Sequence, residues 1–323
     1  MDDLTKITLK DKKILRELDL NARQSNTQIA KNTRLNKNIV NYRIKKLEEL
    51  EIITGYKTLF DYSKLGYLIF RIYLDFYEFD LEKEKELIQY LTKNKKAGSV
   101  FTTTGTWDLT AKIYVKSVNE FWEEWTKFIN LFRPIIKKYH TSTIAHQIYF
   151  KKNYLVPSKV KDDFLWKTGR NEPIEIDKTD LIIIKELTEN ARVPIETLSK
   201  ITKLGSMGII YRIRQLIKKE IILGYRANLN LNLLGYEKYH IDLELEDTSI
   251  TSSLITFLQQ QNSIVSITQA ISDGSDFEFS LEISNFKQFS NLIKKLKIQF
   301  KGKIRDFKYF KFDHSHKLNY LPL

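Results

Sequence analysis

The chain repeats itself once at a constant offset of 169 residues. Asn21-Ala22-Arg23 recurs as Asn190-Ala191-Arg192, and Leu65-Gly66-Tyr67 recurs as Leu234-Gly235-Tyr236. Between Asp11 and Tyr67, about 22 of roughly 57 positions are identical without a gap, far more than chance gives at a single offset. The period is much longer than the roughly 20–50 residues of a solenoid repeat. The sequence therefore predicts two copies of one module.

Each copy begins with a pattern that is typical of a winged helix-turn-helix. In the first copy, residues 11–20 place apolar side chains on one helical stripe, and Ser25 has the spacing to Gln28 that caps a second, short helix. A third helix is expected over residues 36–50, with Val40, Ile44 and Leu47 on its buried face. A β ribbon over residues 52–60 follows. Three helices and a ribbon are the outline of a winged helix-turn-helix.

The rest of each copy has a different rhythm. In the first copy, alternating and helical patterns predict a strand, a helix, two strands, a helix and a strand, at residues 68–77, 81–95, 99–104, 108–116, 118–132 and 135–150. This order is that of a ferredoxin-like β-α-β-β-α-β fold. The predicted class is α+β, with the following domains: winged helix-turn-helix 1–60, ferredoxin-like 61–152, connector 153–173, winged helix-turn-helix 174–229 and ferredoxin-like 230–323. Because the connector holds Phe164, Leu165 and Trp166 beside Pro157, we expect it to dock on the protein.

Composition narrows the classes of partner. Lys and Arg number 53 and Asp and Glu 40, which gives a formal net charge of +13 over 323 residues, so a polyanion is a fitting partner. The absence of cysteine excludes disulfides and thiolate zinc sites. No apolar run approaches the ~20 residues of a membrane span, and the acidic N-terminus is unlike a secretory signal. We expect a cytoplasmic protein with no membrane partner.

The third helix of each copy and the turn before it carry the basic charge. Residues 31–46 and 200–219 each contain six basic residues and no acidic residue. Phosphates are neutralised by Lys and Arg, and base edges are read by flat groups such as those of Arg and Asn. The predicted DNA-binding residues are Arg34, Asn36, Lys37, Asn38, Asn41, Tyr42, Arg43, Lys45, Lys46, Lys203, Ser206, Arg212, Arg214 and Lys218.

Two alternatives bear on this assignment. A basic helix can simply present a solvated face, and Arg43 and Arg212 can instead form ion pairs with a neighbouring helix. The second copy lacks the three asparagines and has two glycines, Gly205 and Gly208, at its helix start. We therefore expect the first copy to supply most of the sequence readout and the second mostly to position the chain.

The middle turns of the two ferredoxin-like domains form a second candidate site. Thr104, Gly105 and Asp108 lie at one turn, and Gly274 and Asp276 lie at the other. Backbone groups beside a glycine and a carboxylate could hold a small effector, although Gly and Asp are also favoured in turns for purely local reasons. No catalytic or metal constellation is predicted, and no cofactor: His140 and His146 are expected on one face of a strand, without a thiol or fixed carboxylate.

The segment from Asp11 to Tyr67, with the Gly105 and Asp108 turn beyond it, resembles the Lrp/AsnC (feast/famine) transcription regulators over nearly the whole of each copy. The resemblance implies DNA binding without enzymatic activity, an amino-acid effector near the turn, pairing through the sheets and assembly into larger homo-oligomers. In this chain, we expect the two copies to pair as an intramolecular pseudo-dimer.

Two other functions remain as alternatives. Sirohaem decarboxylases are similar in arrangement, and their large anionic tetrapyrrole substrate suits a basic chain. They need a pocket of histidines and arginines, and the sheet domains hold only His140, His146 and His240 with Arg71, Arg133 and Arg305. A non-specific architectural DNA-binding or RNA-binding protein is the other alternative.

Overall fold

The computed structural model of the protein describes residues 7–77, 80–156, 166–169 and 171–321. The first copy contains α1 (Leu9–Leu20), α2 (Asn26–Thr33), α3 (Lys37–Glu49), β1 (Ile53–Phe60), β2 (Leu68–Phe76), α4 (Leu81–Lys93), β3 (Ala97–Gly105), β4 (Leu109–Val115), α5 (Val118–Phe132) and β5 (Ile136–Tyr149). The second contains α6 (Lys178–Glu189), α7 (Ile195–Thr202), α8 (Ser206–Lys218), β7 (Ile222–Leu229), β8 (Glu237–Leu245), α9 (Thr251–Gln259), β9 (Ile264–Ile271), β10 (Phe277–Ile283), α10 (Phe286–Gln299) and β11 (Ile304–Leu318). The predicted α+β class and element order are confirmed.

Local signals place the first three helices. The Ser25 side chain accepts a hydrogen bond from Gln28 N at 3.2 Å, as its spacing predicts, but the Gln28 side chain donates to Asn32 instead of returning to the cap. The reciprocal capping box lies one helix earlier, between Thr8 and Asp11. Asn36 caps α3 by accepting from Asn38 N at 2.8 Å.

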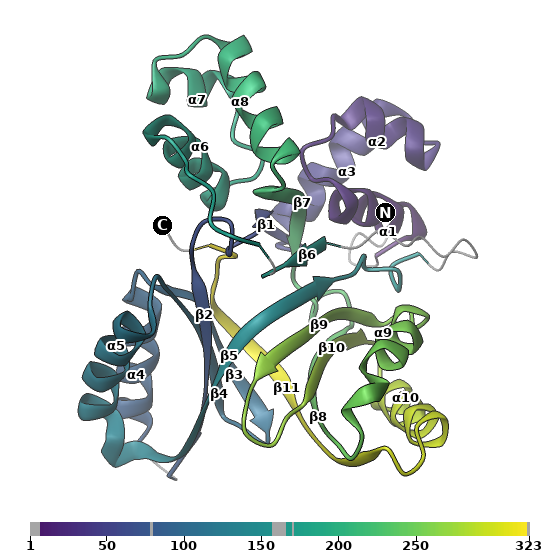
Figure 1. The fold of residues 1–323 in the computed structure, drawn as a ribbon. Helices are drawn as coiled ribbons and strands as arrows, with labels where there is room; N and C mark the ends of the chain where they lie inside the picture. The colour runs from purple at the N-terminus through teal and green to yellow at the C-terminus, as the bar shows by residue number, and fades with distance from the viewer. Residues whose placement is uncertain (1–6, 78–79, 157–165, 170, 322–323) are drawn as a thin grey trace.

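The strands that follow the two helix-turn-helix units pair with each other. β1 and β7 form an antiparallel two-stranded ribbon. Each unit also bonds to the ribbon strand of the other copy, because Ala22 N donates to Tyr225 O at 2.8 Å and Ala191 N donates to Tyr56 O at 2.9 Å. The predicted ribbon therefore exists, but its partner strand belongs to the other copy. The helix-turn-helix units lie together at one end of the molecule, above the sheet (Figure 1).

The two ferredoxin-like domains close into one barrel. Each domain contributes four antiparallel strands, in the orders β5-β2-β4-β3 and β11-β8-β10-β9. β3 pairs with β11, and β5 pairs with β9, so both edges of each sheet are taken up by the other copy and an eight-stranded ring results. This confirms the predicted intramolecular pseudo-dimer. Full closure leaves no unpaired edge in the ring.

The helices cover the outside of the barrel, and charged and aromatic side chains line its inside. Phe70, Ile72 and Leu74 of β2 pack outward against α4 and α5, and the equivalent face of the second copy packs against α9 and α10 (Figure 1). Since side chains alternate along a strand, Arg71 of β2 and Lys112 of β4 face inward. No helix of the described part of the chain has the length and apolar character to cross a bilayer.

The connector docks on the barrel, as predicted, in the part that the structure describes. β6 (Trp166–Thr168) pairs with β5, and Trp166 is buried against the ribbon at Gly224. Pro157, Phe164 and Leu165 lie outside the described residues.

Candidate functional site: the helix-turn-helix surface and the barrel cavity

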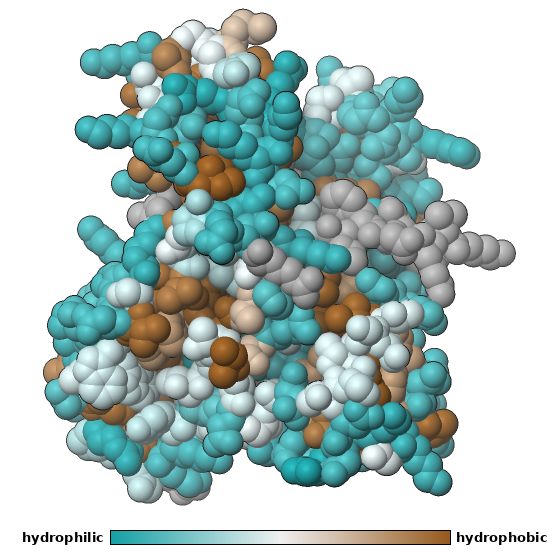
Figure 2. All heavy atoms as spheres, viewed as in Figure 1, coloured by the Kyte–Doolittle hydropathy of each residue, from teal (hydrophilic) through white to brown (hydrophobic). Residues whose placement is uncertain are grey.

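Helix α3 presents the polar side chains predicted to contact DNA. Its apolar face, Val40, Ile44 and Leu47, is buried against the rest of the unit. The opposite face exposes Lys37, Asn38, Asn41, Tyr42 and Lys45, with Lys46 partly covered. Hydrophilic side chains dominate the surface of both helix-turn-helix units (Figure 2). A nucleic acid can therefore reach the predicted residues.

The asparagines of α3 differ in how they are held. The Asn36 side chain caps α3 by accepting from Asn38 N, and its contact with DNA stays a prediction. Asn41 is held from outside the helix, because its Oδ1 accepts a hydrogen bond from Asn26 Nδ2 at 2.7 Å. Asn38 is exposed near the helix start. A fixed amide and an exposed amide one turn apart can face base edges.

The two arginines of the predicted set face their own units. Arg43 lies 2.7 Å from Asp11, and Arg212 lies 2.7 Å from Asp177 and 2.8 Å from Asp180. The backbone N–H of Asp180 and then the Arg212 guanidinium hold the pKa of Asp177 below its ordinary value. Both arginines thus form the ion pairs of the alternative, which hold the third helix to the first, and their contact with DNA stays a prediction.

Helix α8 exposes a less polar surface than α3. Ser206, Met207, Tyr211, Arg214 and Lys218 are all exposed, while Ile209, Ile213 and Leu216 are buried. Gly205 stands at the N-cap and offers no side-chain cap. Arg34 and Lys203 end the preceding helices with φ of 56° and 59° and are also exposed, so both present charge at the turn.

The aspartates at the middle turns of the barrel domains accept hydrogen bonds from the protein's own backbone. Asp108 Oδ2 accepts from Phe76 N at 2.8 Å, and Asp276 Oδ2 accepts from Leu245 N at 2.7 Å. Thr104 donates to Asp313, and Gly105 lies against the β11 backbone at Tyr309. Gly274 has a φ of +70°, as a turn requires. Local turn chemistry accounts for these contacts, and an effector at these turns stays a prediction.

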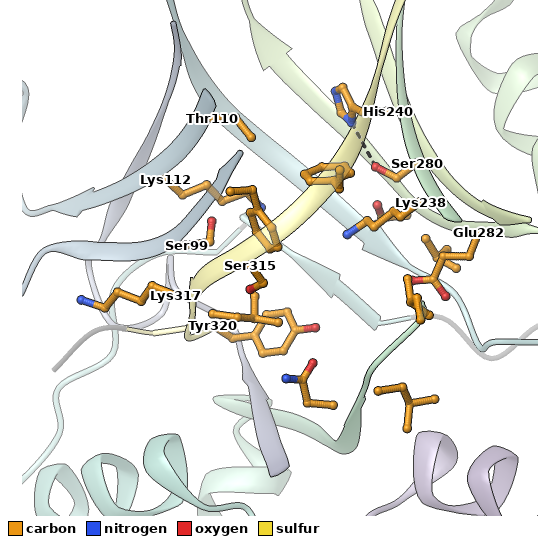
Figure 3. Close-up of a pocket in the computed structure, with 18 of the residues that line it drawn as sticks. Ser99, Thr110, Lys112, Lys238, His240, Ser280, Glu282, Ser315, Lys317 and Tyr320 are labelled. Atoms are coloured by element: carbon orange, nitrogen blue, oxygen red, sulfur yellow. Dashed lines mark hydrogen bonds between the residues drawn. The ribbon is translucent and has the colours of Figure 1, made fainter. Parts of the chain in front are cut away.

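The barrel contains a cavity that no sequence pattern predicts. This barrel cavity has a volume of about 560 Å³ and is lined by inward-facing side chains of both copies, including Arg71, Thr110, Lys112, Lys238 and His240. In Figure 3, Lys112 and Lys238 extend from different strands toward its centre. The sequence shows only charged residues at alternate positions of otherwise apolar strands, and that pattern does not show that the sheets close around these residues.

Ion pairs neutralise part of the charge in and around the barrel cavity. Arg71 lies 2.5 Å from Glu278, Lys152 donates to Glu282 at 2.6 Å, and Arg226 donates to Asp19 of α1 at 2.7 Å. Burial opposes the ionisation of Glu278, but the nearby Arg71 and His240 lower its pKa to about 2. Each of these acids is therefore matched by a cation.

Lys112 and Lys238, which extend into the barrel cavity, lack such a partner. Among the described residues, no carboxylate lies within 4 Å of the Lys112 or Lys238 ammonium group. Lys112 Nζ has a long hydrogen bond of 3.4 Å to Gln147. Burial lowers the pKa of Lys238 to about 8 and holds that of Lys112 well below its ordinary value.

One group of side chains in the barrel has metal-ligand spacing. The ligand atoms of His240, Asp242 and Glu278 all lie within 4.8 Å of one another. Arg71 lies 3.2 Å from His240 Nε2 and pairs with Glu278, so a guanidinium already supplies the positive charge that a metal ion would bring. His240 and Glu278 are thus parts of a salt-bridge network.

Comparison with known proteins gives matches to each copy and to the whole chain. A winged helix-turn-helix DNA-binding family matches residues 7–54 and 176–222. An uncharacterised HTH-type transcriptional regulator of Pyrococcus furiosus is 32% identical over 115 residues, which span 34% of this chain and 74% of that protein. The leucine-responsive regulatory protein of Rhizobium meliloti is 25% identical over 122 residues, spanning 37% of this chain and 78% of that protein.

A solved structure matches the tandem arrangement. The crystal structure of the sirohaem decarboxylase NirDL covers 96% of this chain and 92% of its own, with a TM-score of 0.60 and 12% sequence identity. At that identity the likeness concerns the fold, and it shows that the architecture of two helix-turn-helix units on one barrel exists in another protein.

Proposed function

The chain belongs to the Lrp/AsnC family and carries two modules of that family in tandem, and on this premise we propose that it is a transcription regulator that binds double-stranded DNA through α3 and α8. The observation that carries the proposal is the exposure of the polar face of both helices. A basic helix that served only packing would spend its cations on neighbouring acids, as Arg43 and Arg212 do. Lys37, Arg214 and Lys218 instead face solvent. Lys45 is also exposed, although its ammonium group lies 4.0 Å from Glu49.

The two copies divide the work of recognition. On α3, Asn38 and Asn41 can form paired hydrogen bonds with a base edge, while Lys37 and Lys45 neutralise phosphates. On α8, Met207 and Ile210 stand where α3 has Asn38 and Asn41, so that helix contributes chiefly phosphate contacts from Arg214 and Lys218 and from Lys203 at the turn. Such a protein binds an asymmetric site, with one half read closely and the other held by charge.

Binding of the full chain to a pool of genomic fragments at increasing salt tests the proposal. We expect enrichment of a shared motif on sequencing and a steep loss of affinity with salt. K37A/K45A should reduce the slope of log affinity against log salt by about 0.9 for each phosphate that the variant no longer neutralises. K294A/K295A is the matched control, because both lysines are exposed on α10, far from the helix-turn-helix units.

Three results would contradict parts of this proposal. Absence of retained DNA at low salt contradicts it altogether. Salt-dependent retention without an enriched motif supports a non-specific architectural protein. An unchanged slope for K37A/K45A removes α3 from the interface.

A second function, that of a sirohaem-decarboxylase-like enzyme, is favoured by the barrel cavity with its inward-facing Arg71, Lys112, Lys238 and His240. NirDL, which has the same architecture, has also been solved with an iron-uroporphyrin III analogue. Incubation of the purified chain with sirohaem, followed by mass spectrometry, tests this function. Loss of carbon dioxide from the tetrapyrrole supports it, and an unchanged tetrapyrrole contradicts it.

A further inference from the structure

We infer that the barrel cavity binds an organic anion that carries an apolar body and at least two carboxylate or phosphate groups, with Lys112 and Lys238 as its charge partners. The inference does not rest on DNA binding, because the cavity lies inside the barrel and the helices α3 and α8 lie outside it.

The acids that line or border the cavity already have positively charged partners. Glu278 pairs with Arg71, and Glu282 accepts hydrogen bonds from Lys152 and Tyr154. Lys238 stands directly opposite Glu282 in the strand register, yet that carboxylate is held by Lys152 instead. Lys112 is directly opposite Arg71, a like charge. Lys112 and Lys238 therefore remain without a carboxylate within 4 Å among the described residues. Lys317, which also lines the cavity, donates instead to the Asn94 carbonyl at 2.8 Å.

An unmatched cation inside a protein is costly, because it leaves water without gaining a counter-charge. The low pKa of Lys112 and the pKa of about 8 of Lys238 express that cost. Methionine at either position would keep the length of the side chain without the cost. A bound anion would offset this desolvation cost, because two ammonium groups that extend into one cavity match a ligand with two negative groups.

The walls of the cavity indicate what joins the negative groups. Its volume of about 560 Å³ is within the range of small-molecule pockets. Aromatic rings make up much of the lining: Phe101, Tyr114, Tyr149, Phe310, Phe312 and Tyr320. Lys238 Nζ lies 4.6 Å from the Phe312 ring centre. Ser99, Thr110 and Ser315 add hydroxyl groups (Figure 3). An apolar body with anionic substituents fits this lining.

The site exists once because the two copies have diverged inside the barrel. The cross-strand pair Arg71–Lys112 of the first copy occupies the position that His240–Ser280 holds in the second. The pair Lys238–Glu282 of the second copy stands where the first copy has Ile69 and Tyr114. Each copy thus supplies one of the two free ammonium groups, and a barrel made of two identical copies would not hold the same pair.

Binding should take up protons. The charged groups around Lys112 are Arg71 of β2, Lys238 of β8 and Glu278 of β10. Those around Lys238 are Glu282 of β10, Lys152 and Arg226 of β7. An anion favours the charged form of both lysines and so raises their pKa values. At pH values where the ligand is ionised, affinity should therefore fall as the pH rises through 8, where the free Lys238 loses its proton.

Calorimetry and thermal melting of the full chain with naphthalene-2,6-dicarboxylate or uroporphyrin III test the inference, and the two probes distinguish a small aromatic dicarboxylate from a tetrapyrrole. We expect one of them to raise the melting temperature of the wild type and to bind with proton uptake, measured in two buffers of different ionisation enthalpy. K112M/K238M should lower the affinity at least tenfold while melting at or above the temperature of the free wild type. K294M/K295M, which removes two exposed lysines of α10, should bind as the wild type does.

The inference is overturned if neither probe binds at millimolar concentration, or if K112M/K238M binds as tightly as the wild type. Should that variant fail to fold, the proton uptake of the wild type decides: binding without uptake overturns the inference. DNA affinity is measured on the same preparations, so a failure here is separate from a failure of DNA binding.

Discussion

Arg43 and Arg212 occupy the same position of the repeat, and each faces an acid on the first helix of its own unit. Other residues of the predicted set face solvent, among them Lys37, Asn38 and Asn41 on α3 and Arg214 on α8. At the residue scale, we therefore expect recognition to depend on side chains that point away from the unit, whatever their charge.

We predict that N38A/N41A reduces discrimination between bases more than K203A/R214A does. Each amide removed should cost about 1–3 kcal/mol of discrimination at the base it reads, because paired hydrogen bonds are made to one base edge only. K203A/R214A should instead weaken binding to all sequences alike and reduce its salt dependence. Affinities for an enriched motif and its single-base variants give both quantities.

If K203A/R214A relaxes the sequence preference more, the roles of the two copies are reversed. Arg214 is the appropriate choice in that variant because Arg212 is held by Asp177 and Asp180. K294A/K295A serves again as the control for a general loss of positive charge.

At the scale of elements, two glycines differ in the space that surrounds them, one at the end of a strand and one inside a helix. Gly105 ends β3 with a φ of +129°, and a Cβ there would lie 2.9 Å from Tyr309 O of β11. Gly208 lies within α8, and a Cβ there would meet only Leu204 at 3.8 Å. The first permits two strands of different copies to approach, whereas the second only weakens a helix.

We predict that G105A destabilises the protein by about 1–3 kcal/mol and that G208A stabilises it by about 0.5–1 kcal/mol. The first forces a side chain into a left-handed backbone and into the space between β3 and β11. The second removes the entropic cost of a glycine in a helix. Urea unfolding of the two variants beside the wild type gives the values, and a G105A variant as stable as the wild type would show that the barrel closes without this close approach.

For the molecule as a whole, barrel closure puts Arg71 of one copy on Glu278 of the other. The pKa of Glu278 is depressed to about 2 from an ordinary value of 4.5, so its ionised form favours the folded state. The corresponding stability is fully present above pH 4.5 and is lost as the pH falls toward 2.

We predict that E278Q lowers the pH-dependent part of the free energy of unfolding by on the order of 3 kcal/mol, because a pKa shift of roughly two units corresponds to that free energy. The variant should also be less stable than the wild type at pH 7, because it leaves Arg71 buried without a full counter-charge. Free energies of unfolding measured from pH 7 to pH 2 test both statements. E123Q, at an exposed acid of α5, should leave the curve unchanged, and a wild-type curve parallel to that of E278Q would contradict the prediction.

The sequence by itself determined the duplication, the order of the elements and the polar face of α3. These depend on local periodicity and on short-range capping, which each copy carries in its own residues. It also predicted that the copies pair, through the resemblance to a family whose members pair by their sheets.

Only the tertiary structure decided what the pairing creates. The partner of β1 is β7, a strand of the other copy. In β5, the register shifts between Ile144 and His146. His146 therefore lies against Gly169, on the side of the strand away from the inward-facing Gln147. The barrel cavity combines Lys112 with Lys238, which lie in different copies, far apart along the chain. The physical reason is that register, bulges and ring closure depend on contacts between distant strands, and no local pattern records which two strands will meet.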